Sequence, residues 1–347
     1  GGSSVAGAEQ FKKVKAIVEA DPERRVVVVS AAGKRNADDH KLTDLLYLCH
    51  AHLNYGVSCS DIFNTIEQRL TEIRDELGLS YDIESELKEL ERTLSKDTPV
   101  DLLVSRGEYF TSKLMAEYLG YTFVDAADCV IFSFDGSIDY ERSYALIAEA
   151  AEKYGRIVIP GFYGRVSTGK IKVMTRGGSD ITGSLAAVAV NADVYENWTD
   201  VSGILMADPR IVDNPEPIKK ITYAELRELA FMGATVLHEE SVQPVREKGI
   251  PLNIRNTNRP QDPGTMIVGN IDRENSDDRF ITGIAGRKNF TIITLQKHDM
   301  HTSHSLRQAL EVFERYHAPI EHIALGLDSF ALVTSSAGLG ESIYQLM

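Results

Sequence analysis

The sequence predicts an α/β protein in which a mainly parallel sheet is covered by helices on both faces. Residues 24–30, RRVVVVS, form a continuous apolar run, which is typical of a strand buried on both faces. From residue 121, strand-like runs alternate with helical runs, namely 121–124, 129–133 and 155–161 against 139–153 and 180–190. Strand, helix and strand at this spacing imply right-handed crossovers, and therefore three layers with the sheet in the middle.

Helical periodicity occupies much of the chain between the first strand and this alternation. Residues 41–53 carry leucines at helical spacing, and residues 107–120 form another helix, which a glycine ends. Residues 61–94 hold two charged amphipathic helices separated by GLSY, a helix stop followed by an Asp N-cap. We expect this pair to form a helical hairpin.

The rest of the chain predicts the end of a large domain, a linker and a small module. Residues 191–256 add two strands and two helices, and the large domain is assigned to residues 1–268. Residues 269–280 are polar and are interpreted as a linker. Residues 281–347 show a β–α–β pattern that is incomplete over the last dozen residues. We therefore expect a second domain of the α+β type there.

Composition and charge narrow the function classes. The 347 residues carry a formal net charge of -14, which argues against nucleic acid and anionic membranes as partners. No apolar run reaches the roughly 18 residues of a membrane span, and Gly1-Gly2-Ser3-Ser4 is not a leader peptide. Three cysteines without CxxC spacing fit a reducing compartment, the cytosol. The chain opens inside an expected glycine turn without an initiator methionine, so residues before Gly1 are expected to be missing from this numbering.

Residues 176–180, Arg-Gly-Gly-Ser-Asp, join a strand to a small-residue helix. Paired glycines let the backbone approach a ligand, and Ser179 or Asp180 can cap a helix whose N–H groups then face an anion. Arg176 can clamp a carboxylate with two hydrogen bonds. A tight turn with Arg176 and Asp180 as a surface ion pair explains the stretch equally well.

Three other stretches carry polar residues suited to a site, each with an ordinary structural alternative. Residues 197–210 place Thr199, Asp200, Asp208 and Arg210 on one loop, although an Asp-Pro turn accounts for the last two. Glu108 opens a helix, where a carboxylate often only balances the helix dipole. In residues 231–244, His238 is interpreted as a core histidine.

Together, and in this order, these stretches resemble the aspartate kinases of the amino-acid kinase family. The motifs are GGSSVA (1–6), VVVVSAAGKRN (26–36), RGE (106–108), PGFYG (160–164), TRGGSD (175–180), WTDVSGI with ADPR (198–210) and FMGATVLHEESVQPV (231–245). The resemblance implies the three-layer amino-acid kinase fold for residues 1–268. It also implies an ACT-like regulatory domain for residues 281–347.

The resemblance implies transfer of the γ-phosphoryl group of ATP to the β-carboxylate of L-aspartate, with Mg²⁺. This reaction opens lysine, threonine and methionine biosynthesis. No residue of the chain is assigned as a metal ligand. Arg176 is expected to bind the substrate α-carboxylate and Glu108 the α-ammonium. Asp180 is expected to organise the reacting centre.

The remaining residues take expected places around these three. The residues expected to border aspartate are Ser30, Phe162, Gly177, Gly178 and Ser179. Those expected to cradle the transferring phosphates are Gly1, Gly2 and Ser3. Those expected at the ATP site are Thr199, Asp200, Leu205, Asp208, Arg210 and Thr235.

Three departures from the family pattern concern the ATP side. The lysine of the family's opening would lie before Gly1. Thr235 stands where the family has a phosphate-binding lysine, and Glu239 replaces a proline. Leu205 replaces a tyrosine expected near adenine.

Two other functions stay open at this stage. A kinase acting on glutamate or N-acetylglutamate would use the same clamp of arginine and glutamate. A non-catalytic, amino-acid-binding regulatory subunit is the alternative outside the enzymes, and a lysine two positions before Gly1 would argue against it.

The second domain is expected to bind an end-product amino acid, lysine or threonine, and to pair the chain as a homodimer. Residues 319–333 would line that site, with Glu321, His322 and Asp328 as candidates. Each of the three is equally well explained as a solvated loop residue.

Overall fold

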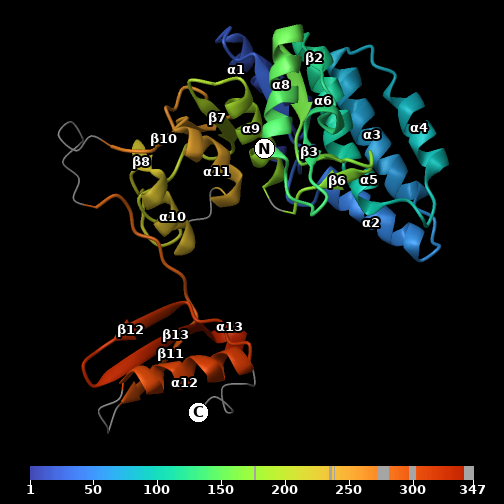
Figure 1. Cartoon of the computed structure of the whole chain (residues 1–347). Coiled ribbons are helices and arrows are strands. Elements are labelled where there is room, and N and C mark those ends of the chain that lie inside the picture. Colours follow the sequence, from blue (N-terminus) through green and yellow to red (C-terminus); the bar gives the residue numbers. More distant parts are fainter. Residues whose placement is uncertain (176, 234–236, 238, 272–280, 297–301, 340–347) are drawn as a thin grey trace. The chain divides into compact units, whose positions relative to one another are not determined.

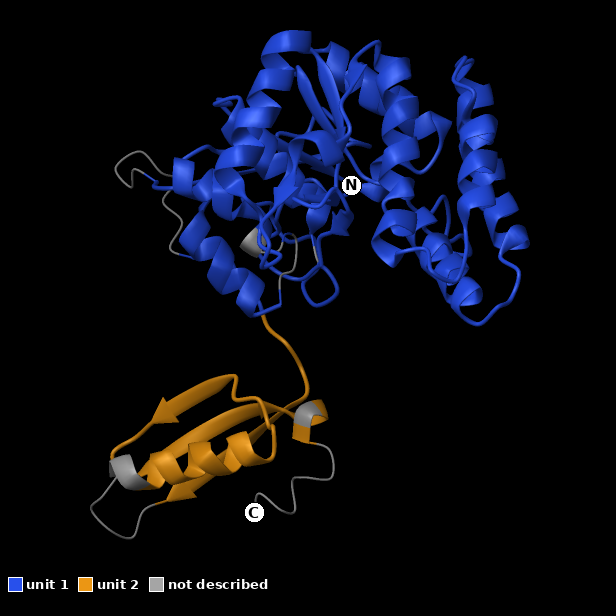
Figure 2. Cartoon of the chain, turned by 45° about the vertical axis from the view of Figure 1, so that its right-hand side comes forward, with its two compact units in different colours: residues 1–285 blue, residues 286–347 orange. Residues whose placement is uncertain are grey.

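The chain divides into two compact units, residues 1–285 and residues 286–347 (Figure 2). The structure is a computed structural model that describes residues 1–175, 177–233, 237, 239–271, 281–296 and 302–339. Residues 281–285 belong to the first unit, because Thr282 Oγ1 donates to Glu225 Oε1 at 2.9 Å and the Ile284 N–H to Met206 O at 2.7 Å. The unit boundary therefore lies a few residues beyond the expected start of the second domain at 281.

Two sheets of the first unit carry most of its parallel strand pairs (Figure 1). One has the order β1-β4-β2, with β1 (Val26–Val29), β4 (Ile157–Pro160) and β2 (Thr122–Phe123) all parallel. The other has the order β7-β9-β10-β8, with β7 (Tyr195–Thr199), β9 (Leu252–Asn256), β10 (Thr265–Val268) and β8 (Lys220–Thr222). Only β9 and β10 pair antiparallel in it. The predicted mainly parallel sheet is confirmed, and β1 and β7 are each an edge strand of their part.

A third, smaller sheet lies beside these, and helices make up the rest of the unit. The small sheet contains β3 (Ile131–Phe132), β5 (Tyr163–Val166) and β6 (Ile171–Val173). The helices are η1 (Gly2–Val5), α1 (Ala8–Glu19), α2 (Leu42–Asn54), α3 (Ser60–Leu77), α4 (Ile83–Thr93), α5 (Val100–Val104), α6 (Arg106–Leu119), α7 (Ala126–Cys129), α8 (Tyr140–Tyr154), α9 (Gly178–Ala189), α10 (Tyr223–Phe231) and α11 (Glu239–Lys248).

Helices cover both faces of the β1-β4-β2 sheet. Successive side chains of a strand point to opposite faces, and in β4 they enter different cores. Val158 packs into a core built with α1, α2, α3 and α6, whereas Ile157 and Ile159 pack into a core built with α8 and α9. The three-layer α/β architecture follows from this alternation.

The expected helical hairpin over 61–94 corresponds to α3 and α4 (Figure 1). Gly78 ends α3 in the left-handed region (φ 66°), where glycine carries no Cβ penalty. Asp82 caps α4 by accepting from the Ser85 N–H at 3.2 Å. Arg74 of α3 pairs with Glu84 of α4, so the two helices are tied together near their connection.

The second unit is a three-stranded antiparallel sheet with one long helix. It contains β11 (Phe290–Gln296), α12 (Thr302–Arg315), β12 (His322–Leu325), β13 (Ser329–Ser335) and α13 (Ser336–Leu339), and the sheet order is β11-β13-β12. Because β11 and β12 both run antiparallel to β13, they are parallel to each other. The β–α–β pattern is therefore split, with β13 between its two strands.

The length and hydropathy of the described helices decide whether any of them could span a membrane. None of them is both long enough and apolar enough to cross a bilayer.

Candidate active site

Two glycine-containing turns meet after the carboxyl end of β4. A Cβ on Gly161 would lie 2.6 Å from Ser179 Oγ, and a Cβ on Gly178 would lie 2.8 Å from Phe162 Cα. Gly177 has φ 57°, and Phe162 has φ 77°, which is an uncommon conformation for a non-glycine residue. Such strain persists only where the surroundings fix it, and it clusters at ligand sites. The PGFYG motif and the glycines before α9 thus form one contact.

Glu108 lies in the first turn of α6 against the loop that follows β1. It is only 4% exposed, and the backbone N–H groups of Ala31 and of Glu108 itself hydrogen-bond to its carboxylate. Its Oε2 atom has no hydrogen-bond partner among the described residues. Burial raises the pKa of Glu108 to about 8, and the two backbone hydrogen bonds oppose this shift. The site therefore contains a buried carboxyl group with one oxygen left for a ligand.

The glycine turn at residues 1–3 packs against this same loop and against the end of β7. The Gly33 N–H donates to Gly2 O at 2.9 Å, and a Cβ on Gly33 would lie 2.6 Å from the Gly2 carbonyl carbon. The Gly1 nitrogen donates to Trp198 O at 2.9 Å. Only glycine at position 33 permits this close approach to Gly2. The turn is therefore held by Gly33 on one side and by Trp198 on the other.

Asp180, in the first turn of α9, is oriented by β7. Asn197 Nδ2 donates to Asp180 Oδ1 at 2.8 Å, and Tyr195 Oη donates to the Asp180 carbonyl at 3.3 Å. The Gly1 nitrogen lies near the carboxylates of both Asp180 and Asp200. Asp180, Asp200 and the glycine turn are therefore close together.

The loop after β7 is fixed by the end of β9. Asn256 Nδ2 donates to the Asp200 carbonyl at 3.2 Å and to Ser202 Oγ at 3.0 Å. The Thr257 N–H donates to Thr199 O at 2.8 Å. Thr199 and Asp200 thus have a defined backbone, and Thr199 Oγ1 donates to the Asp200 carboxylate at 3.2 Å.

Asp208 and Arg210 lie further along that loop and pair with each other. Arg210 Nη2 is 2.6 Å from Asp208 Oδ2, and the Arg210 side chain is 86% exposed. Leu205 forms an isolated bridge to Pro217 at the base of this segment. This part of the expected ATP site is an exposed surface loop and not a closed pocket.

Comparison with known proteins agrees with the motifs. The model of the amino acid kinase family matches residues 1–256. Aspartokinase 3 of Bacillus subtilis is 35% identical over 348 residues, which cover 96% of this chain and 76% of that protein. The chain belongs to the amino acid kinase family.

Solved structures place it among the aspartate kinases of that family. The crystal structure of the Clostridium acetobutylicum aspartate kinase matches with a TM-score of 0.91 and 45% identity, over 99% of this chain and 79% of that one. Escherichia coli aspartokinase III in complex with aspartate and ADP matches with a TM-score of 0.74 and 26% identity, over 97% of this chain and 78% of that one. The same enzyme in complex with lysine and aspartate gives a TM-score of 0.77.

In this amino acid kinase, the expected site residues fall into two groups. The gathered group is linked by successive contacts. Gly1, Ser30, Ser179 and Asp180 line one cavity, and Phe162 contacts Gly178, which follows Gly177. Gly2 and Ser3 pack on Gly33, Glu108 bonds to Ala31, and Asp200 with its neighbour Thr199 lies near Gly1. Asp208 and Arg210 lie on the exposed loop with Leu205. Arg176, Thr235 and His238 lie outside the described residues.

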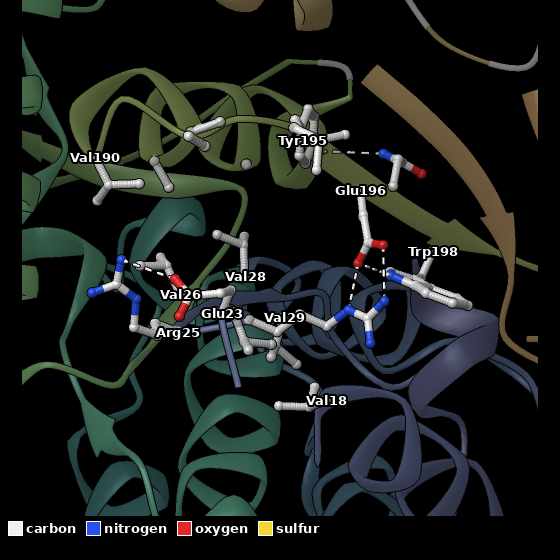
Figure 3. Close-up of a pocket in the computed structure, with 18 of the residues that line it drawn as sticks. Val18, Glu23, Arg25, Val26, Val28, Val29, Val190, Tyr195, Glu196 and Trp198 are labelled. Carbon is white, nitrogen blue, oxygen red and sulfur yellow. Dashed lines mark hydrogen bonds and ion pairs between the residues drawn. The ribbon is translucent and has the colours of Figure 1, made fainter. Parts of the chain in front are cut away.

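A cavity of about 540 Å³ opens beside the gathered group (Figure 3). Figure 3 shows Val26 and Val28 of β1 on one wall and Tyr195 and Glu196 of β7 on the facing wall. The carbonyls of Arg25 and Val29 accept from the N–H groups of Ile157 and Gly161, so the alternate residues Val26 and Val28 turn their backbone groups away from β4 and toward the cavity. The β1 wall is thus a strand edge lined with valine, whereas the β7 wall also carries Glu196 and Asn197. Gly1, Ser30, Ser179 and Asp180 also line the cavity, together with charged residues such as Glu23, Arg25 and Glu196.

Several residues of this region carry a clear role in the structure but were not found from the sequence. Tyr195 and Asn197 reach Asp180 from the same face of β7, two positions apart. Polar residues with this period of two at the end of a strand were the signal that could have found them. Asn256 and Arg69 had no such signal, because their contacts join distant parts of the chain.

The three regulatory candidates do not form one cluster within the second unit. Glu321 accepts from Arg287 at 2.8 Å and lies next to His322, where β12 begins. Asp328 lies in the turn between β12 and β13, beyond the opposite end of β12. One small ligand cannot contact all three in a single copy of the unit.

Proposed function

We propose that the chain is an ATP-dependent aspartate kinase whose aspartate site is built around Glu108. The observation that carries this assignment is the unpartnered Oε2 of a buried carboxyl group beside Ser30 and the glycine turns. A buried anion is costly unless a cation or donor satisfies it, and the α-ammonium of an amino acid supplies both. Arg176 is expected to take the α-carboxylate, so that the β-carboxylate points toward the phosphates.

The reaction then needs positioning and charge neutralisation. A β-carboxylate oxygen forms a bond to the γ-phosphorus while the bond from that phosphorus to the bridging oxygen breaks, and ADP leaves with the electron pair. The backbone N–H groups at Gly1, Gly2 and Ser3 are suited to stabilise the phosphoryl oxygens. Asp180, held by Asn197, is suited to orient the groups around the transferring phosphoryl.

Mg²⁺ is proposed as part of the nucleotide substrate. The described residues contain no group of three or more His, Cys, Asp or Glu side chains that could hold a metal. Mg²⁺ often keeps several waters and binds through substrate phosphates with one or two carboxylates. Asp180 and Asp200 are the carboxylates near the glycine turn. They fit a site in which Mg²⁺ is held by substrate phosphates and one or two carboxylates. The metal would neutralise charge on the phosphates.

The nucleotide is proposed to lie along Thr199 and Asp200, with the exposed loop at Asp208 and Arg210 closing over it. The structure of Escherichia coli aspartokinase III in complex with aspartate and ADP supports the use of both a nucleotide and aspartate. Thr235 and Leu205 stay predicted ATP contacts. All three cysteines are free and buried, which fits the predicted cytosolic location.

The test uses Glu108→Gln with two acceptors, L-aspartate and succinate, which lacks the amino group. Losing a charge-assisted pair should raise the KM for aspartate roughly 10- to 100-fold while succinate changes little. Glu117→Gln, an exposed change on the same helix, is the control and should leave both unchanged. Equal losses for aspartate and succinate would make Glu108 structural. If the parent chain released ADP with glutamate but not with aspartate, glutamate would be the substrate and the proposed assignment would be wrong.

The second unit is proposed to carry feedback control and self-association. Escherichia coli aspartokinase III was solved with lysine as well as aspartate, so lysine is the first effector to try and threonine the second. Edge strand β12 exposes Leu325 (69%), and Leu327 in the following turn is 91% exposed, which is an apolar edge suited to pairing with a second copy. An effector acts only if it binds two states of the enzyme with different affinity.

That control is tested by measuring aspartate phosphorylation at sub-saturating aspartate with and without each effector. The full chain should respond to lysine or threonine, and a chain ending at residue 285 should not. Light scattering should give a dimer for the full chain. A full-length response that survives the truncation would place the effector in the first unit.

A further inference from the structure

Arg69 is a buried cation on the helical hairpin with no place in the roles above. It lies on α3 and is only 3% exposed, on the face that also buries Phe63, Ile66 and Leu70. A buried guanidinium is stable only where several acceptors satisfy it. Its partners therefore show what the residue holds.

Both partners of the Arg69 fork belong to the loop that follows β1. Arg69 Nη2 donates to the Gly33 carbonyl at 2.6 Å, and Nη1 donates to the His40 carbonyl. Nη2 also lies 3.5 Å from Asp39 Oδ2. One planar group thus clamps the two ends of the loop segment 33–40, a task for which the rigid fork of arginine is better suited than lysine.

Gly33 connects this clamp directly to the glycine turn. Its carbonyl accepts from Arg69, while its N–H donates to Gly2 O at 2.9 Å. A Cβ at Gly33 would lie 2.9 Å from the Ser3 nitrogen as well. Any displacement of the Gly33 backbone is therefore transmitted to Gly2 and Ser3.

The same loop reaches Glu108, but through residues that are anchored independently. The Ala32 N–H donates to Thr111 Oγ1 of α6 at 3.2 Å, and Ala32 O accepts from the Leu42 N–H at 3.1 Å. Ala31 and Ala32 thus stay attached to α6 and α2 when Arg69 is changed. The two ends of the loop respond to different anchors.

We propose that Arg69 is a positioning residue for the phosphates of ATP, acting through Gly33 on the glycine turn at residues 1–3. It touches neither substrate, and its effect falls on nucleotide binding more than on aspartate binding. This inference rests on the proposed function for its kinetic part, and the packing of Gly33 on Gly2 tests it without that function.

The experiment compares Arg69→Met, Arg69→Lys and Arg74→Met with the parent chain. Arg74 lies on the same helix, but its partners are Asp75 and Glu84 and not the loop. The KM values for ATP and for aspartate are measured separately. Hydrogen exchange is followed for the Gly33 amide, which reports its bond to Gly2 O.

Arg69→Met should raise the KM for ATP about tenfold, the size expected for losing charge-assisted hydrogen bonds, and change that for aspartate less than about twofold. Protection of the Gly33 amide should fall by roughly tenfold or more. Arg69→Lys, which keeps the charge and one donor contact, should recover part of both. Arg74→Met should lower the melting temperature without either effect.

Three results would overturn the inference. They are an unchanged ATP KM and Gly33 exchange in Arg69→Met, equal rises for ATP and aspartate, and the same changes in Arg74→Met. If Arg69→Met does not fold, Arg69→Lys decides by the same two measurements. A parent chain that binds no ATP would refute the proposed function, while the exchange of Gly33 still tests the link from Arg69.

Discussion

The aspartate half of the proposed site, around Glu108, and the nucleotide half, around Arg210, differ in how far their charges are removed from water. Glu108 is 4% exposed, and the loop after β1 and helix α6 fix its surroundings before any ligand arrives. Arg210 is 86% exposed and is neutralised by its neighbour Asp208. A charge in a dry site interacts strongly with a ligand, whereas an exposed pair is screened and worth little.

This difference predicts that the two proposed substrates are recognised in different ways. The aspartate half is pre-formed, so its residues should act strongly and specifically, and they should reduce the stability of the empty protein. The nucleotide half is partly a surface loop, so its residues should act weakly until ATP orders them. Asp180 lies near the glycine turn and should matter most.

The largest effect is expected for Asp180→Asn. Asparagine keeps the shape and can still accept from Asn197 Nδ2, which is 2.8 Å from Asp180 Oδ1, but it removes the charge at the reacting centre. We expect kcat to fall by about 10²- to 10³-fold, as when one preorganised electrostatic group is lost. Steady-state kinetics with both substrates varied measures this.

Asp193→Asn is the matched control for that change. Asp193 is exposed and lies between α9 and β7, outside the gathered group. Its kcat should equal that of the parent chain. If the kcat of Asp180→Asn stays within a few-fold of the parent value, Asp180 only stabilises the first turn of α9 and has no role in the reaction.

The next effect is on stability, and its sign follows from the pKa of Glu108. The folded pKa of about 8 lies above the ordinary value of 4.5, so the folded state holds this proton more tightly. Stability from this group is present below pH 4.5 and is lost as the pH rises to about 8. Glu108→Gln should therefore match the parent at low pH and exceed it by roughly 3–5 kcal/mol in free energy of unfolding above pH 8.

Urea unfolding of the aspartate-free protein between pH 5 and 9 measures this difference. Glu117→Gln provides a contrast of opposite sign. The Glu117 carboxylate accepts from the Ser80 N–H and Oγ, both at 2.7 Å, and these bonds lower its pKa although burial opposes them. That variant should lose stability at high pH. A Glu108→Gln gain that does not depend on pH would mean that burial of the charge is not its cause.

The two halves also differ in how much of them the sequence could predict. Alternating apolar runs were enough for the three-layer fold, because packing on both faces of β1 and β4 requires apolar residues at every position of these strands. Glu108 and the glycines before α9 were found through the order of short motifs. The burial of Glu108 could not be predicted, since it depends on Ala31, which is 77 positions away.

Long-range contacts set the limit on such prediction. Asn256 fixes the Asp200 loop, and Arg69 fixes Gly33, across 56 and 36 positions of sequence. Neither forms part of a local pattern, because each side chain donates to backbone carbonyls. Every residue has a carbonyl, so the sequence does not indicate which donor it will bind. The contacts of residues 281–285 are long-range in the same way. Residues 281–285 look like a strand of the second unit but bond to Met206 and Glu225.

The smallest effect is expected for Arg210→Ala, and it is the most direct test of the contrast. The Arg210 side chain extends into solvent and pairs only with Asp208 among the contacts described for it. Exposed ion pairs contribute little to folding, so the melting temperature should not change measurably. If the loop closes over ATP as proposed, the KM for ATP should rise by about two- to fivefold, with kcat and the KM for aspartate unchanged. Raising the salt concentration should shrink that difference, because screening weakens exposed charges first. A rise of a hundredfold would instead mean that ATP buries Arg210 as fully as Glu108 is buried, and that the two halves differ only before the nucleotide binds.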